Sequence, residues 1–162
     1  MPEGTCSVYY RTRLALLTAL AGFVAAELHA DVRALGESLP EVTGDDGVER
    51  AIDATTEMLL RWSEHPELVI TISELALEAA RTPSLSEPII AWRLDLTQVV
   101  EEIVCRRTEQ PEPRLRAEAI VASLDGVVLG GLLATSRTER PAYLRSMVSL
   151  VLRALVDAPI EG

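Results

Sequence analysis

Aromatic residues are scarce in this sequence: Phe, Trp and Tyr together make up 4% of its 162 residues. Any core must therefore be built from Leu, Val, Ile and Ala, which dominate an apolar fraction of 48%. These residues, with few alternating β-branched runs, favour helices over sheet. The length is that of one domain, or of one domain with a fragment of a second.

Cysteine is also scarce. Cys6 and Cys105 lie far apart and form no CxxC pair, so we interpret them as two free thiols in a reducing compartment, the cytoplasm. The N-terminus has no basic segment followed by an apolar run and a small-residue cleavage site, so we expect no signal peptide. We also expect no membrane span, because the nearest candidate, 117–134, is interrupted by Glu118 and Asp125.

Positive charge is in short supply. The chain has 15 Lys and Arg residues against 25 Asp and Glu residues, which gives a formal net charge of -10 and a pI of about 4.7. Phosphate neutralisation requires clustered basic side chains. The composition therefore argues against a chain that binds DNA by itself. An acidic surface of this kind mainly favours solubility.

Catalytic motifs are missing as well. The sequence has no HExxH, GxSxG or paired CxxC motif, and DGVVLGG lacks the Lys-Ser/Thr end of a P-loop. His29 lies off the apolar stripe of its helix, which predicts a solvated surface residue, and His65 precedes Pro66 at a turn or helix start. Glu101 and Glu102 point about 100° apart on a helix, so they form no carboxylate dyad. We therefore expect no enzyme, no cofactor and no metal site.

The spacing of apolar residues predicts six helices separated by turns rich in Pro, Gly, Ser and Asp. Gly36 is expected to end the first helix. Asp46 with Glu49, and Ser84 with Glu87, have the spacing of capping boxes at the second and fourth helices. The expected ranges are 13–35, 46–64, 66–81, 85–109, 114–135 and 141–156.

The last two predicted helices are apolar on more than one face. Residues 119–134 read AIVASLDGVVLGGLLA, with one charge, and the sixth helix carries two apolar stripes. A small domain covers only one such face, so the pair predicts a symmetric homodimer through a four-helix bundle. Which stripe faces the partner is left open. The candidates for burial at or beside the interface are Leu124, Val128, Leu132, Leu144, Val148, Val151 and Leu155. Small residues that would let helix backbones approach closely are Ala122, Gly126, Gly130 and Gly131.

The two tryptophans have two interpretations. One is ordinary core packing, and the other is that they line an apolar pocket between helices. Met58 lies one turn before Trp62, so these two side chains would share a wall. The second interpretation predicts a cavity that accepts a mostly apolar small molecule. Its expected lining residues are Met58, Trp62, Leu75, Trp92 and Leu96.

The stretch PEGTCSVYYRTRLALLTAL resembles the end of the DNA-binding domain in TetR-family transcriptional regulators. The matching positions are Gly4 and Thr5 in the recognition-helix segment, Tyr9 at the aromatic position that commonly meets a DNA phosphate, Tyr10 where Phe is usual, Arg11 to Arg13 in the basic turn, and Leu16 and Leu17 at the opening of the next helix. Downstream, ELALEAARTPSLSEPIIAWR resembles the sixth-to-seventh helix region of the family, and AEAIVASLDGVVLGGLLA resembles its eighth helix.

The resemblance implies an all-α fold, a TetR-like C-terminal helical domain whose last two helices form the dimer interface. It divides the chain into a remnant of a recognition helix, 1–11, and a ligand-binding and dimerisation domain, 12–162. The two head helices that support a recognition helix in the major groove are not in the sequence given. A disordered terminus is the competing interpretation of residues 1–11. The DNA-contact remnant implied by the resemblance comprises Thr5, Tyr9, Arg11 and Arg13.

Two functions follow from these patterns. The leading hypothesis is a ligand-responsive regulator, represented by its sensor and dimer domain, in which a small apolar effector changes the spacing of two DNA heads. The rival is a headless interaction protein that heterodimerises with a full-length regulator and blocks its DNA binding. In-frame sequence upstream of Met1 encoding two basic helices would distinguish them. Under both hypotheses the expected location is the cytoplasm, and no contact with a membrane is expected. DNA is expected to bind only if the head helices are present.

We predict that residues 1–162 alone bind duplex DNA no better than nonspecifically, because the reading helix lacks its support and the net charge is -10. A gel-shift assay with the purified chain measures this. Tight, sequence-selective binding by this chain alone would contradict the prediction.

Overall fold

The computed structural model describes residues 13–39, 44–107, 111–134 and 136–157. Within these ranges the chain forms helices and no strands. The helices are α2 (Arg13–Ser38), α3 (Gly44–Glu64), α4 (Pro66–Ala79), α5 (Pro83–Arg107), α6 (Pro113–Ala134) and α7 (Arg140–Asp157). The predicted all-α fold is confirmed, and each expected helix is present.

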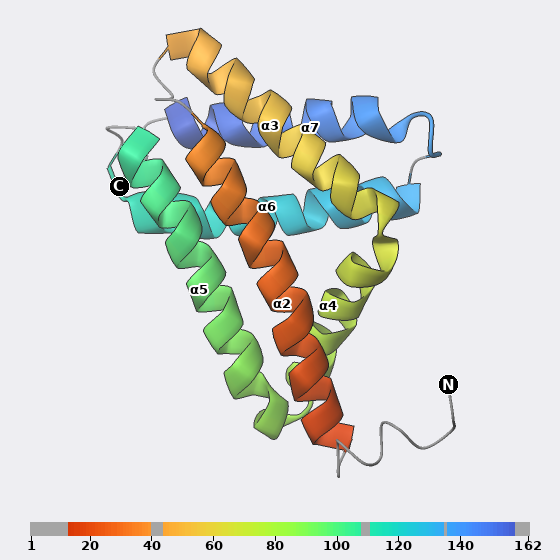
Figure 1. The fold of residues 1–162 in the computed structure, drawn as a ribbon. Helices are drawn as coiled ribbons and strands as arrows, with labels where there is room; N and C mark the ends of the chain where they lie inside the picture. The colour runs from red at the N-terminus through yellow and green to blue at the C-terminus, as the bar shows by residue number, and fades with distance from the viewer. Residues whose placement is uncertain (1–12, 40–43, 108–110, 135, 158–162) are drawn as a thin grey trace.

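The helices form a wedge with one broad end and one narrow end (Figure 1). Helices α2 and α5 lie side by side and run in the same direction, and together with α4 they converge at the narrow end. At the broad end, α6 crosses behind α2, α7 packs along α6, and α3 packs along α7. Helix α6 therefore has neighbours on several sides, with α5 and α7 as its main contacts.

Gly36 lies inside α2, so the prediction that it ends the first helix was wrong. A Cβ atom at Gly36 would lie 2.7 Å from the side chain of Ile103, so glycine lets α2 and α5 approach closely here without displacing that side chain. The helix continues to Ser38, whose hydroxyl donates to the carbonyl of Leu35 at 2.8 Å. Periodicity alone cannot distinguish a glycine that ends a helix from one against which a neighbour packs.

The helix starts also differ from the predicted capping boxes. Helix α3 begins at Gly44 and α5 at Pro83, so Asp46 and Ser84 lie inside their helices rather than at the N-caps. Pro83 at the first helical position fits the usual preference, because proline lacks an N–H group that would go unused there. Apart from the end of α2 at Ser38, the remaining starts and ends lie within two residues of the expected ranges.

A capping box that the sequence analysis missed precedes α7. The backbone N–H of Ser136 donates to Glu139 Oε2 at 3.2 Å, and the N–H of Glu139 donates to Ser136 Oγ at 3.3 Å. The hydroxyl of Ser136 also donates to the same carboxylate, and these bonds lower the pKa of Glu139. The Ser-x-x-Glu spacing of this pair was visible in the sequence.

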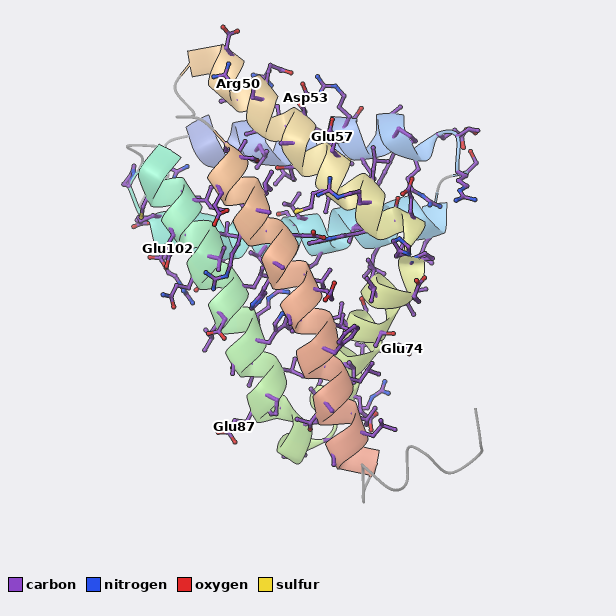
Figure 2. All side chains as sticks on the ribbon, viewed as in Figure 1. Arg50, Asp53, Glu57, Glu74, Glu87 and Glu102 are labelled. Carbon is purple, nitrogen blue, oxygen red and sulfur yellow. The ribbon has the colours of Figure 1, made fainter. Side chains whose placement is uncertain are left out.

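The main core lies at the broad end, where α3, α6 and α7 meet. Ile52, Leu59, Leu144 and Val148 have no exposed surface there. A smaller cluster around Leu75 fills the narrow end. Charged side chains cover the outside: Figure 2 shows Arg50, Asp53 and Glu57 on α3, Glu74 on α4, and Glu87 and Glu102 on α5 pointing away from the helical bundle.

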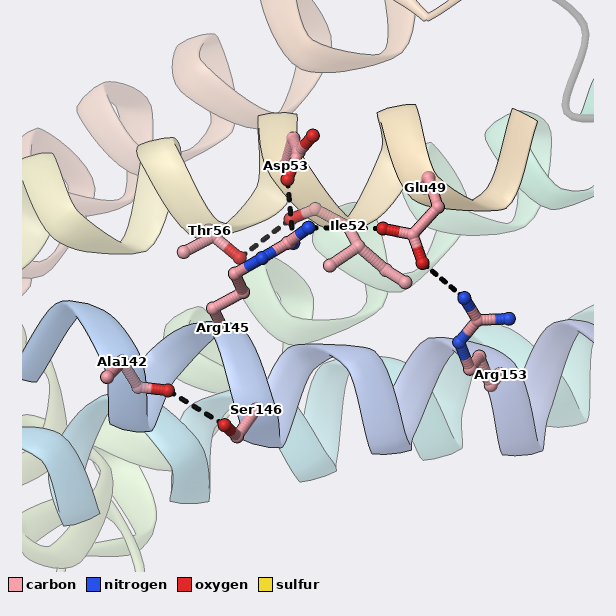
Figure 3. Close-up of polar contacts among 8 residues, drawn as sticks. All are labelled: Glu49, Ile52, Asp53, Thr56, Ala142, Arg145, Ser146 and Arg153. Carbon is pink, nitrogen blue, oxygen red and sulfur yellow. Dashed lines mark hydrogen bonds and ion pairs between the residues drawn. The ribbon is translucent and has the colours of Figure 1, made fainter. Parts of the chain in front are cut away.

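Ion pairs join α3 to α7 along one edge of the broad end (Figure 3). Arg145 lies 3.1 Å from Glu49 and 2.7 Å from Asp53, and Arg153 also pairs with Glu49. These side chains are close to half exposed, so each pair contributes little free energy. Their position nevertheless defines which side of α7 faces α3.

A buried arginine joins the start of α6 to the end of α7. Arg116 is 1% exposed. Its Nε donates to the carbonyl of Pro111 at 2.9 Å, and its Nη1 donates to the carbonyl of Leu155 at 2.5 Å. Leu155 lies in the last turn of α7, where unpaired carbonyls give the helix end a partial negative charge that favours a cation.

Residues Ala15–Ser38 are long and apolar enough to cross a membrane by length and composition alone, which corrects the expectation that no stretch of the chain reaches that limit. In the structure, Val24, Leu28 and Val32 of this segment are buried against other helices. The core helix of a soluble protein meets the same criterion. One face of the segment packs on α4 and α5, whereas Phe23 on it is 61% exposed.

We predict that Arg116→Met lowers the free energy of unfolding by about 2–3 kcal/mol, because it removes the hydrogen bonds of a buried, charged side chain to the carbonyls of Pro111 and Leu155. Urea denaturation measures the change. Arg114→Met is the matched control, since Arg114 lies on the same helix and pairs with Glu101 and Glu118 at the surface. Equal effects of the two substitutions would show that Arg116 has no special role.

Candidate ligand cavity and outward helix face

A cavity of about 110 Å³ lies at the broad end, between α2, α3, α5, α6 and α7. An apolar cavity of roughly 150 Å³ is known to hold benzene, so this smaller one has room for at most a single six-membered ring. Its lining is apolar except for Thr55 and Asp125. The lining residues are Val32, Leu35, Leu39, Val48, Ala51, Thr55, Met58, Leu59, Trp62, Leu96, Val100, Ile103, Val104, Ile120, Val121, Leu124, Asp125 and Leu152.

The sequence produces this lining by helical spacing. Helix α3 contributes Val48, Ala51, Thr55 and Met58, which are three or four residues apart and so share one face. Trp62 follows on the same face, and its Nε1 donates to Asp31 Oδ2 at 2.6 Å. This bond satisfies the indole N–H and fixes Trp62 against α2.

Three of the five predicted pocket residues line the cavity: Met58, Trp62 and Leu96. Leu75 and Trp92 do not, and the predicted lining is corrected at these positions. Leu75 is buried in the smaller cluster at the narrow end, because α4 packs there and not beside the cavity. Trp92, one turn before Leu96, packs against that cluster and against the other core clusters without lining the cavity.

Trp92 instead contacts His29, which was predicted to be a solvated surface residue. The two rings stack with centroids 6.1 Å apart and an angle of 19° between their planes. His29 is partly buried, so that prediction was wrong, and burial lowers the pKa of its imidazole. Within the described part of the chain, His29 Nε2 and Trp92 Nε1 are buried without a hydrogen-bond partner. His65, in contrast, is exposed at the N-cap of α4, as expected.

The walls contributed by α2, α6 and α7 were not predicted from the sequence. Val32 and Leu35 belong to the regular apolar stripe of α2, so a signal was available for them. Asp125 on α6 had been noticed only as an interruption of an apolar run. Its carboxylate forms an ion pair with Arg93 of α5. Burial raises the pKa of Asp125, and the neighbouring guanidinium of Arg93 opposes that rise.

The residues predicted at a dimer interface lie on the inner sides of α6 and α7. Val128, Leu144 and Val148 are buried in the core of the subunit itself, so the stripe to which they belong, which the sequence left open, faces inward. Leu124 lines the cavity. The remaining three are partly buried against the same core: Leu132, Val151 and Leu155.

The opposite sides of these two helices carry a second apolar stripe, here called the outward face. Leu133 is 83% exposed and Leu150 is 64% exposed. A Cβ atom added at Gly126 would meet nothing within 4 Å. Since α6 and α7 pack side by side, their exposed stripes are neighbours. The outward face comprises Leu115, Ala122, Gly126, Leu133, Leu150 and Ala154, together with Leu129 and Met147, which are partly buried against the core.

Two of the predicted small contact residues act within the subunit. A Cβ atom at Gly130 would lie 2.5 Å from the Tyr143 hydroxyl, and one at Gly131 would lie 3.1 Å from Leu144. These glycines therefore allow α6 and α7 to approach each other closely. Ala122 and Gly126 instead lie on the outward face.

Comparison with known protein families shows which family this chain belongs to. The family model described as the tetracyclin repressor-like, C-terminal domain matches residues 46–158. The chain belongs to this family. No curated protein and no solved structure gave a significant match. The TetR-family resemblance is thus confirmed at the level of the regulatory C-terminal domain, a fold that is not enzymatic in this family.

The family match covers α3 to α7 and begins after α2. Of the residues predicted as a DNA-contact remnant, Thr5, Tyr9 and Arg11 lie outside the described residues. Arg13 opens α2, and its side chain is not described. The TetR assignment therefore rests on the C-terminal helices.

We predict that Ala51→Leu leaves stability unchanged or raises it by about 0.5–2 kcal/mol, because Ala51 lines the cavity and the added carbons fill empty space. Ala117→Leu is the matched control. Ala117 is fully buried and does not line the cavity, so enlarging it should cost about 1–3 kcal/mol. Urea denaturation of both variants gives the comparison. If Ala51→Leu is as destabilising as Ala117→Leu, the cavity is not open space.

Proposed function

We propose that this TetR-family chain is the sensor and dimerisation part of a ligand-responsive transcriptional regulator. Residues 12–162 would form that unit, and a mostly apolar small molecule would be its effector. The cavity supports the effector, because its lining is almost wholly apolar. The family supports a cytoplasmic location and a role in transcription regulation rather than catalysis.

The observation that carries the proposal is the position of α6. Ile120, Val121 and Leu124 line the cavity from this helix, whereas Gly126 and Leu133 lie on its outward face. A ligand in the cavity therefore touches the same helix that presents apolar surface to the outside. An exposed stripe of this kind is typical of a protein interface rather than of a free surface.

We propose a homodimer in which the outward faces of two subunits pack as a four-helix bundle. Each subunit would contribute α6 and α7, and Gly126 would allow close approach of the backbones. The cavity ligand would favour one arrangement of this bundle over another, because only differential binding shifts an equilibrium between two arrangements. In a protein with DNA-binding heads, that shift would change the spacing between the heads.

We predict that Leu133→Asp and Leu150→Asp convert the dimer into folded monomers, because each puts an unpaired charge into the proposed interface. Sedimentation velocity at micromolar concentration measures the mass, and circular dichroism checks the fold. Leu77→Asp is the control: Leu77 is 61% exposed on α4, outside the outward face, so this variant should remain a dimer.

Val148→Asp should behave differently from the two outward variants. Val148 has no exposed surface, so a charge there should unfold the subunit rather than separate two subunits. The dimer proposal fails if the unmodified protein sediments as a monomer at micromolar concentration, or if Leu133→Asp leaves the mass of the dimer unchanged.

A further inference from the structure

The cavity contains one charged lining residue, Asp125, among apolar walls. The Asp125 side chain lines the cavity, so a molecule entering the cavity can reach it, and the side chain is 47% exposed. Its Oδ2 accepts a hydrogen bond from Arg93 Nη1. Its second oxygen has no hydrogen-bond partner within the described part of the chain. A free acceptor at the cavity wall is a site for a hydrogen-bond donor.

The charge of Asp125 is already balanced by Arg93. A cationic ligand would therefore add an uncompensated positive charge to an apolar cavity, which is unfavourable. An anionic ligand would meet Asp125 rather than Arg93, because Arg93 is not among the lining residues. A neutral donor avoids both costs, and an O–H group bound to a carboxylate forms one of the stronger hydrogen bonds in proteins.

We propose that the cavity binds a neutral, ring-sized apolar molecule carrying one hydroxyl group, an alcohol or a phenol, and that Asp125 accepts the hydrogen bond from this hydroxyl. The inference rests on the proposed ligand-binding function and adds the chemical class of the ligand. The volume of about 110 Å³ sets the size, and the apolar walls require that the rest of the molecule be hydrocarbon. The directional bond falls on α6, the helix of the outward face.

Four probes of similar size and different polarity test this assignment: benzyl alcohol, toluene, benzylammonium and benzoate. Isothermal titration calorimetry with the full chain at pH 7.5 gives their affinities. We expect benzyl alcohol to bind about tenfold more tightly than toluene, which is equivalent to ~1.4 kcal/mol. Benzylammonium and benzoate should bind more weakly than benzyl alcohol.

Variants connect this preference to Asp125. Asp125→Ala should remove the tenfold preference for benzyl alcohol over toluene. Glu118→Gln is the control, because Glu118 is an ion-paired acid on the same helix that does not line the cavity. It should leave the preference intact. Arg93→Met leaves Asp125 without its counter-charge, so benzylammonium should become the tightest of the four probes.

The outcomes separate this inference from the proposed function. Equal affinities for toluene and benzyl alcohol would overturn the role of Asp125 and leave an apolar ligand site in place. Tightest binding of benzylammonium by the unmodified protein would overturn the choice of a neutral ligand. Failure of all four probes to bind would contradict the ligand-binding function itself, and the inference with it.

Discussion

Burial of α6 is the constraint on which the rest of the subunit depends. This helix is apolar around most of its circumference, so no orientation lets it present a fully polar side to water. Helices α5 and α7 cover much of it, and Arg116 ties its first turns to the last turn of α7. What remains uncovered is the stripe that contains Gly126 and Leu133. The domain thus buries this apolar helix only in part, and the remainder is the surface on which a second subunit is proposed to pack.

The same helix connects the interior of the subunit to its surface. Between Val121, which lines the cavity, and Ala122, which is exposed, there is a single peptide bond. A rigid helix that shifts to accommodate a ligand must move both sides together, and packed interfaces respond to such shifts by changing between discrete arrangements. The ion pairs of Arg145 with Glu49 and Asp53 extend this connection, because they join α7 to α3, another wall of the cavity.

The helices themselves could be predicted from sequence, because their apolar spacing and the Pro and Gly breaks between them are local signals. Which faces of these helices pack against one another could not be predicted in this way. Val148 and Leu150 lie on two stripes of one helix that are equally apolar, and only the placement of α3 and α6 decides that the first is buried. Trp92 was expected in the pocket, but its ring stacks on His29 of α2 instead. Asp125 was visible as a charge in an apolar run, yet its position at the cavity wall depends on the packing of α5 against α6.

The central claim is that occupancy of the cavity and the arrangement of two subunits are coupled through α6. Pulsed electron–electron double resonance between two spin labels tests it most directly. The label is placed on Ser146→Cys, an exposed position of α7, in a variant in which Cys6 and Cys105 are replaced by serine. The account predicts a defined distance between the labels of two subunits, and a shift of that distance when benzyl alcohol saturates the cavity. A distance that is unchanged by a bound probe, or no distance between subunits at all, would contradict it.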